Sequence, residues 1–381
     1  MSTSTDAPIV EAIRAALAGV EDPEIRRPIT ELGMVKDVAM AADGTADIGI
    51  WLTVAGCPMR ETITQRVTAA ASAVPDVRAV RVALDVMSDE QLTALRKQLR
   101  GPGNDAVIPF AEPGSLTRVY CVASGKGGVG KSSVTVNLAA SMAARGLSVG
   151  VVDADIYGHS VPRMLGVTSL PTKVENMIMP PQAHGLKVIS IGMFTSGNSA
   201  VVWRGPMLHK ALHQFLADVF WGDLDVLLMD LPPGTGDVAI SCAQLIPSAE
   251  ILVVTTPQLA AAEVAERAGS IALQTKQRLV GVVENMSWLE LPSGERMEVF
   301  GSGGGKAVAG SLSTMLGADV PLLGQVPLDP RVRESGDEGT PLVLSAPETA
   351  AAQALSAVAE RLAVRARGLA GMSLSITPSG R

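Results

Sequence analysis

The sequence predicts an α/β protein, with a doubly wound, mostly parallel sheet preceded by a small α+β domain. Apolar runs recur through the later part of the 381-residue chain, and helical patterns or long connections separate most of them. Strands that alternate with helices are typical of parallel sheets. Hydrophobic residues make up 47% of the chain but aromatic residues only 3%, so Val, Ala, Leu and Ile must build the core. That composition suits a parallel sheet buried on both faces, and the length suits about two domains.

Residues 1–100 carry the pattern of the α+β domain. We expect a helix over 8–18, two strands on either side of the hairpin signal Asp43-Gly44, a helix over 59–72 and a strand over 80–86. Ser88 and Gln91 form a capping box that opens a last helix. Residues 101–117 are rich in glycine and proline and are interpreted as a linker.

Residues 118–368 are predicted to form the sheet domain. Its expected strands are 119–123, 149–152, 188–191, 226–229, 251–254 and 280–283. A helix from residue 348 to about 367 closes it, and residues 369–381 are expected to be a flexible tail. The glycines of residues 301–305 are interpreted as a mobile loop.

Charge and composition exclude several classes of function. The net charge of −7 argues against a broad nucleic-acid surface. The sequence contains no run of about 20 uncharged apolar residues and no signal-peptide pattern, so no membrane association is expected. The three cysteines lie far apart and do not resemble a disulfide framework, which favours a reducing cytoplasm.

Residues 125–132 fit the phosphate-binding pattern G-x-x-x-x-G-K-[ST], between an apolar run and a helical pattern. Glycines let backbone N–H groups surround phosphate oxygens, and the next helix points its partly positive end at the same anion. We expect Lys131 to neutralise the β- and γ-phosphates of ATP and Ser132 to ligate Mg²⁺. The flanking strand and helix disfavour the alternative, a chance glycine-rich turn. The loop residues expected to bind ATP are Gly125, Lys126, Gly127, Gly128, Val129, Gly130, Lys131, Ser132 and Ser133.

Acidic residues follow two of the predicted strands. Asp230 ends one apolar run, where its carboxylate can serve Mg²⁺, and Asp153 and Asp155 follow another. Ligands of open α/β sheets lie at the carboxyl edges of the strands. A single Asp after a strand is usually a turn residue, but several acids at the mouth of one sheet favour a site. The Pro- and Gly-rich segment 231–237 suits a loop that senses the γ-phosphate.

Lys126 is a second lysine inside the loop, which the basic pattern does not require. In this feature the chain resembles the deviant Walker A ATPases, the group of MinD, ParA and the nitrogenase iron protein. The resemblance implies that Lys126 reaches across a face-to-face homodimer to the partner's phosphates and that Asp155 orients the attacking water. Lys126, Lys131 and Asp155 are therefore the expected catalytic residues of a slow, dimer-dependent ATP hydrolysis. In the alternative, Lys126 touches phosphate only in its own subunit.

A longer resemblance rests on residues 122–131, 153–158, 203–207, 230–237, 255–258, 283–287 and 326–329. In these segments, which run in family order, the chain resembles the Mrp (ApbC-like) ATPases, which are iron–sulfur cluster carriers. The resemblance implies that Asn285 and the loop around Pro327 hold the adenine. Residues 22–24, 31–35 and 53–58 resemble the SufT/PaaD-like domain, which is also linked to iron–sulfur assembly.

The chain departs from the Mrp pattern at one place. Mrp proteins usually carry Cys-x-x-Cys after the segment that ends at Ser287, and two copies supply four thiolates to a [4Fe–4S] cluster. Here Leu291 and Gly294 occupy those places, and neither can ligate iron. Cys57, just before a helix, and Cys242 are candidate ligands, but Cys57 could equally be an unreactive loop cysteine. A partner could also hold the cluster, or there could be none.

These observations predict an ATP-hydrolysing homodimer that assists iron–sulfur cluster assembly or transfer to apoproteins. Its expected cofactors are ATP and Mg²⁺, and its expected partners are iron–sulfur apoproteins or assembly factors. One alternative is a nucleotide-gated scaffold without a cluster of its own. Another is a MinD- or ParA-like positioning ATPase, which would need a membrane anchor or a basic surface.

Overall fold

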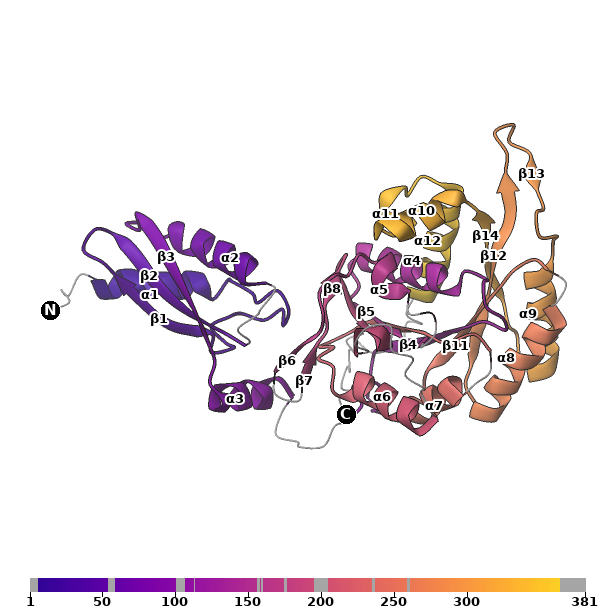
Figure 1. The fold of residues 1–381 in the computed structure, drawn as a ribbon, viewed down its shortest axis with the longest axis horizontal. Helices are drawn as coiled ribbons and strands as arrows, with labels where there is room; N and C mark the ends of the chain where they lie inside the picture. Colours follow the sequence, from indigo (N-terminus) through magenta and orange to yellow (C-terminus); the bar gives the residue numbers. More distant parts are fainter. Residues whose placement is uncertain are drawn as a thin grey trace, which may run out of the picture.

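The computed structural model describes most of the chain, as two domains (Figure 1). The described residues are 6–53, 59–100, 107–112, 114–155, 158, 160–174, 177–194, 205–234, 237–258 and 261–363. We call residues 6–100 the N-terminal domain and residues 107–363 the P-loop domain.

The N-terminal domain is an α+β unit with a three-stranded sheet. Its elements are α1 (Asp6–Leu17), β1 (Val35–Met40), β2 (Thr45–Leu52), α2 (Arg60–Ser72), β3 (Ala79–Val86) and α3 (Asp89–Arg100). The order is β1-β2-β3, with β1 antiparallel and β3 parallel to β2. Alternate residues of β2, from Ala46 to Leu52, are buried as expected. The capping box also forms, since Gln91 N donates to Ser88 Oγ at 3.3 Å and Ser88 N to Gln91 Oε1 at 2.8 Å.

The P-loop domain is built on a nine-stranded sheet. Its elements are β4 (Arg118–Ala123), α4 (Lys131–Ala144), β5 (Val149–Asp153), α5 (Val161–Met164), β6 (Thr172–Val174), β7 (Met177–Met179), β8 (Gln182–Ala183), β9 (Leu186–Ser190), α6 (Gly205–Ala217), β10 (Val226–Asp230), α7 (Asp237–Leu245), β11 (Glu250–Thr255), α8 (Ala261–Thr275), β12 (Leu279–Glu290), β13 (Arg296–Met297), α9 (Gly304–Leu316), β14 (Leu322–Leu328), α10 (Pro330–Glu338), α11 (Leu342–Ser345) and α12 (Ala350–Ala363).

The sheet is parallel through its centre. The strand order is β13-β12-β11-β4-β10-β5-β9-β8, with β14 also paired to β12. Only β8 and β13 pair antiparallel, each as a short strand beside its neighbour. One face is covered by α4, α11 and α12 and the other by α6 to α9, so the central strands are buried on both sides (Figure 1). The predicted doubly wound α/β class is therefore confirmed.

Several segments differ from the sequence prediction. Residues 301–305 are not a loop throughout, because α9 begins at Gly304 and Gly305 N donates to the buried carboxylate of Glu284 at 2.5 Å. Within the predicted linker, Ile108 and Phe110 are buried in the core of the P-loop domain. The predicted tail, residues 369–381, lies outside the described residues. No described helix has the length and apolar character needed to cross a membrane.

The antiparallel hairpin β6–β7 joins the two domains. Val174, Met177 and Met179 are buried in the same hydrophobic cluster as the core of the N-terminal domain. A polar contact lies beside it, where Arg26 Nη2 donates to Gln182 Oε1 at 3.0 Å and to Gly185 O at 3.2 Å. Gln182 Nε2 in turn donates to the carbonyls of Pro23 and Glu24. The N-terminal domain therefore packs on the P-loop domain through both apolar contacts and hydrogen bonds.

Candidate nucleotide-binding site

The glycine-rich loop lies between the end of β4 and the start of α4, at the carboxyl edge of the sheet. Gly128 and Gly130 have φ values of +79° and +78°, in the left-handed region that favours glycine. A Cβ at Gly130 would collide with Nδ2 of Asn285, and a Cβ at Gly125 would lie 2.8 Å from Val264. Side chains are thus excluded where the backbone turns, which leaves its N–H groups free to face an anion.

Lys131, Ser132 and Asp230 meet at this edge. Lys131 Nζ lies 2.8 Å from Asp230 Oδ2, and both side chains are almost fully buried. Ser132 Oγ donates to the same carboxylate oxygen at 2.6 Å, and Thr135 Oγ1 donates to Oδ1 at 2.8 Å. Asp230 is thus a fixed carboxylate at the end of β10, held by groups of α4.

The ammonium of Lys131 has unused donors. It donates no well-formed hydrogen bond to any residue that the structure describes, although it is buried. Asp230 Oδ2, at 2.8 Å, balances its charge but leaves N–H groups of the ammonium without acceptors, and an anionic ligand beside it would accept from them. A cavity of about 200 Å³ lies beside it, lined by loop residues 126–133 with Asp155, Ser160 and Pro233. Its place and its donors fit phosphate groups.

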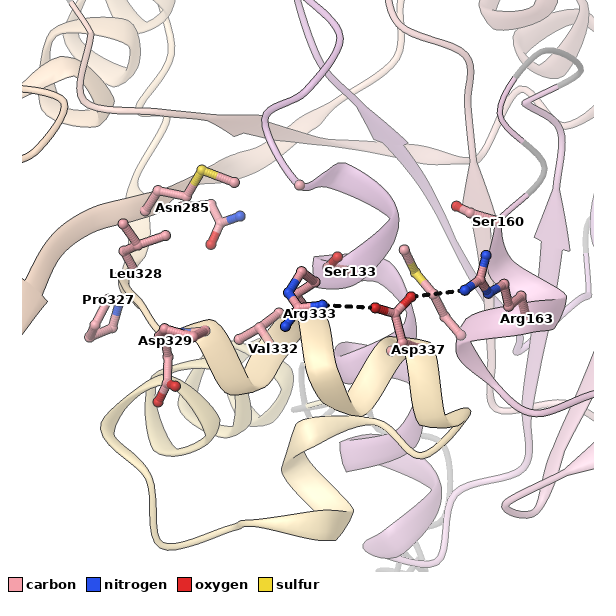
Figure 2. A pocket seen from close by; sticks show the side chains of 15 residues that line it. Ser133, Ser160, Arg163, Asn285, Pro327, Leu328, Asp329, Val332, Arg333 and Asp337 are labelled. Atoms are coloured by element: carbon pink, nitrogen blue, oxygen red, sulfur yellow. Dashed lines mark hydrogen bonds and ion pairs between the residues drawn. The ribbon is translucent and has the colours of Figure 1, made fainter.

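A larger cavity of about 430 Å³ adjoins the first and shares Gly130, Ser133 and Ser160 with it. Figure 2 shows Asn285, Pro327 and Leu328 on one side of this cavity and α10 along another. Asn285 Nδ2 donates to Val129 O at 2.9 Å, which ties β12 to the loop. The structure therefore brings the predicted adenine residues Asn285 and Pro327 together with the phosphate loop.

Helix α10 also contributes to this cavity, which was not predicted from the sequence. Val332, Arg333 and Gly336 line it, and Asp337 pairs with both Arg333 and Arg163 at 3.1 Å. A signal was present in the sequence. Asp329 is followed by Pro330, and a capping residue before a proline is typical of a helix start. In the structure Asp329 Oδ1 accepts from Arg331 N at 3.0 Å, as such a cap requires.

The two acids at the carboxyl end of β5, Asp153 and Asp155, have different surroundings. Asp153 is fully buried and accepts from Ser190 Oγ at 3.0 Å and from Asp155 N at 3.2 Å. Burial, followed by repulsion from Asp230, raises the pKa of Asp153 to about 7. Asp155 instead lines the phosphate cavity, and its Oδ1 accepts from Gly158 N at 3.1 Å. Of the two, only Asp155 is in position to meet a ligand.

Lys126 lies at the outer side of the loop. Its ammonium donates to the side chain of Gln258 in the same chain. It borders both the phosphate cavity and a further cavity of about 220 Å³, which Gln258, Met286 and Phe300 also line. Gln258 therefore holds Lys126 at the rim of the site.

Of the two candidate cluster ligands, the structure describes only Cys242. Cys242 is buried beside Cys121, with 1% of its surface exposed, and both are free thiols. The contact with Cys121 and burial raise the pKa of the Cys242 thiol well above its usual value. A buried thiol that stays protonated does not favour Cys242 as a ligand shared with a second protomer. Cys57 lies outside the described residues.

Leu291 and Gly294, which replace the usual cysteine pair, form the turn of the β12–β13 hairpin. Leu291 N donates to Glu295 O at 2.9 Å and Gly294 N to Leu291 O at 2.8 Å. Within the described ranges, no group of three His, Cys, Asp or Glu side chains could hold a metal ion.

Comparison with known proteins places this geometry in a family. Residues 115–363 match the model of the NUBPL iron-transfer P-loop NTPases, and residues 10–99 match that of an iron–sulfur cluster assembly protein. The iron–sulfur cluster carrier protein of Mycobacterium tuberculosis is 68% identical over 381 residues, which cover 100% of both chains. That of Escherichia coli is 36% identical over 373 residues, covering 96% of this chain and 95% of the relative.

Among solved structures, a nucleotide-binding protein from Archaeoglobus fulgidus in complex with ADP matches with a TM-score of 0.50. It is 32% identical, and the match covers 66% of this chain and 91% of that one. The chain thus belongs to the family of iron–sulfur cluster carrier proteins, P-loop NTPases preceded by an iron–sulfur cluster assembly domain.

Proposed function

We propose that this protein is a homodimeric, Mg²⁺-dependent ATPase that assists the assembly of iron–sulfur clusters or their transfer to apoproteins. The buried ammonium of Lys131 is the observation that carries the nucleotide part, because its unused donors face a cavity behind a glycine loop. Family membership supports the iron–sulfur part. The free thiols of Cys121 and Cys242 are compatible with a reducing cytoplasm as the place of action.

The proposed roles of the loop residues follow from their positions. The N–H groups of residues 125–133 surround the phosphates, and Lys131 neutralises the β- and γ-phosphates. Ser132 Oγ and the Asp230 carboxylate converge to 2.6 Å, and oxygens of this kind suit Mg²⁺. They would hold the ion, which supplies further positive charge against the phosphates. Asn285 and Pro327 would border the adenine in the larger cavity.

Lys126 and Asp155 are the proposed groups for hydrolysis. On closure of the dimer, Lys126 would leave Gln258 and reach the partner's phosphates, so that turnover depends on dimerisation. Asp155, at the wall of the phosphate cavity, would orient the attacking water. Both roles come from the resemblance to deviant Walker A ATPases, and the positions of the two side chains at the cavity support them.

The cluster is the cargo of this proposed function. Two candidate functions differ in whether this chain or a partner provides the cluster ligands. As a carrier, the chain would hold it with Cys57, the one cysteine outside the buried pair, in two protomers and with further ligands. As a nucleotide-gated scaffold, it would only govern a partner that holds the cluster. The burial of Cys121 and Cys242 and the presence of Leu291 and Gly294 at the hairpin turn favour the scaffold.

Anaerobic reconstitution of the full chain with iron and sulfide separates the two. A carrier should bind both elements, lose them in Cys57→Ala and keep them in Cys242→Ala, because the latter thiol is buried. A scaffold should bind neither, yet should change the rate at which a separate donor protein delivers a cluster to an apoprotein when Mg·ATP is added. That effect should vanish in Lys131→Ala. The proposal would be refuted if the protein bound no iron and Mg·ATP had no effect on cluster transfer.

A further inference from the structure

A cavity of about 550 Å³ lies between the two domains, away from the nucleotide site. Residues from both domains line it: Ile25, Arg26, Arg27 and Leu99 come from the N-terminal domain, and its opposite wall includes Lys187 and the segment 220–224. Ser148 and Val149 also line this wall. Its residues thus lie just before β5 and β10 or in the first two residues of β5 and β9, so the cavity is at the amino edge of the sheet. The phosphate loop is at the carboxyl edge. The volume is within the range of small-molecule sites.

Lys187 is the buried cation of this cavity, with 6% of its surface exposed. Its Nζ donates to Trp221 O at 2.7 Å and to Phe220 O at 3.4 Å, and it lies 4.9 Å from the centre of the Phe220 ring. No carboxylate of a described residue is within ion-pair distance of it. Burial, followed by repulsion from Arg26, lowers the pKa of Lys187 to about 8. Its positive charge is thus incompletely compensated by the fold.

Two guanidinium groups add to this charge. Within the described part of the chain, the Arg26 guanidinium donates only to neutral acceptors, Gln182 Oε1 and Gly185 O. Arg27 makes a loose pair with Glu31, at 3.6 Å, between largely exposed side chains. Asp223 is the one acid among the lining residues that the structure describes. Three cations therefore face one cavity with a single carboxylate, and like charges brought together across a domain boundary repel each other.

We propose that this cavity binds a small organic oxyanion, with a phosphate or carboxylate head group held by Lys187, Arg26 and Arg27. Guanidinium groups match the planar, two-oxygen geometry of such heads, and a buried ammonium supplies a point charge. The ring of Phe220 lies beside Lys187, and with Ile25 and Leu99 it gives the remaining wall an apolar surface for the body of the ligand.

The ligand would also join the two domains. Arg26 and Arg27 belong to the N-terminal domain and Lys187 to the P-loop domain, so one anion would contact both. Arg26 already binds the β8–β9 turn directly. A bound anion would remove the repulsion between Arg26 and Lys187 and stabilise the seating of the N-terminal domain, independently of the nucleotide.

The test is calorimetric titration of the full-length protein, with its nucleotide site first saturated with ADP. Inorganic phosphate and the tricarboxylate tricarballylate are the two probes, because they separate the two kinds of head group. At least one should bind saturably. The affinity should fall about tenfold or more in Arg27→Gln and in Lys187→Met, as expected for the loss of one charge-assisted hydrogen bond.

The matched control is Arg81→Gln, since Arg81 is an exposed arginine of β3 that pairs with Asp47 at 3.1 Å. This variant should bind the probe as the wild type does. Arg27 exposes 43% of its side chain, so Arg27→Gln decides the test even if Lys187→Met does not fold. No saturable binding of either probe at about 10 mM would overturn the proposal, because weaker binding is below a useful affinity. Equal binding by the wild type and Arg27→Gln would overturn it too.

Discussion

Two lysines of the P-loop domain are buried to the same degree but differ in what surrounds them. Lys131 and Lys187 each expose 6% of their surface. Lys131 lies 2.8 Å from the Asp230 carboxylate, at the carboxyl edge of the sheet. Lys187, at the amino edge, donates to two carbonyl oxygens, with Arg26 as a repelling neighbour and Asp223 as an acid beyond ion-pair distance.

The difference shows that burial alone does not determine the state of a charged group. The attraction within a buried ion pair offsets the desolvation penalty only when further hydrogen bonds fix the charged groups. Ser132 and Thr135 fix Asp230 in this way. Where burial outweighs the attraction of a more distant acid, the cation is less stable and its pKa falls, as at Lys187, which Asp223 compensates only in part. An incompletely compensated buried cation therefore indicates where an anionic ligand would bind.

The largest expected effect concerns Lys126, the lysine of the loop that is not buried. Lys126→Ala should reduce ATP turnover by about 10³-fold, the lower end of what an arginine finger contributes, because the transition state loses a positive charge. Steady-state phosphate release measures the turnover, and calorimetry measures the ATP affinity. Affinity should change little. Lys306→Ala, at an exposed lysine of α9, is the control. A fall in turnover below tenfold would exclude the cross-dimer role.

Removing the partner of Lys131 tests the comparison itself. Asp230→Asn should lower the free energy of unfolding by about 3 kcal/mol without nucleotide, because it leaves a buried ammonium unpaired. The loss of this ion pair alone would cost more, but Asp230→Asn also removes the repulsion between Asp230 and Asp153, which offsets part of that cost. Urea unfolding measures it. In the exposed Lys36–Asp85 pair, Asp85→Asn should lower the free energy of unfolding far less, because water screens this pair. Similar losses in the two variants would contradict this view of Lys131.

Buried carboxyls in the two domains predict a shared dependence on pH. Burial raises the pKa of Asp153 and of Glu24 to about 7, with repulsion from Asp230 and Asp22 respectively. Between about pH 4 and pH 7 the folded state then binds more protons than the unfolded one, so stability falls as the pH rises. Asp153→Asn and Glu24→Gln should each remove about 2 kcal/mol or less of that fall.

The measurement is the free energy of unfolding in urea at several pH values in this window. Because the two carboxyls lie in different domains, their contributions should add in the double variant. A variant whose pH profile has the same slope as the wild type would show that its carboxyl titrates near the ordinary value.

The smallest expected effect is at Lys187. Its pKa of about 8 is below that of an unfolded lysine, so between about pH 8 and pH 10 the unfolded state binds more protons and stability rises with pH. Lys187→Met should flatten this rise by about 1 kcal/mol. Urea unfolding of both proteins across this window, in a buffer free of phosphate, measures it. Parallel profiles would mean that Lys187 keeps an ordinary pKa.

The phosphate loop and the parallel sheet could be predicted because their signals are local. The apolar runs and the glycine spacing of residues 125–132 are contiguous in the sequence, and each strand lies close to where its run of Val, Leu and Ile indicates. The meeting of Asp230 with Lys131 also follows from topology, since β4 and β10 are parallel neighbours. Parallel neighbours bring their carboxyl ends to one edge.

The junction between the domains could not be predicted in this way. Strands β6 and β7 have three residues each, too few for a periodic pattern, and Met177 and Met179 find their partners more than 70 residues earlier in the chain. The start of α9 at Gly304 depends on Glu284 of β12, whose carboxylate accepts a hydrogen bond from Gly305 N. The cavity at Lys187 needs side chains of both domains, so no local pattern could reveal it.

The most direct test of the account is calorimetric titration of the full-length protein with Mg·ATP, beside Lys131→Ala. We expect saturable binding by the wild type and an affinity at least about tenfold lower in the variant, because Lys131 supplies charge-assisted hydrogen bonds to the phosphates. Circular dichroism checks that the variant is folded. No binding by folded wild type, or equal affinity in the two proteins, would contradict the central claim.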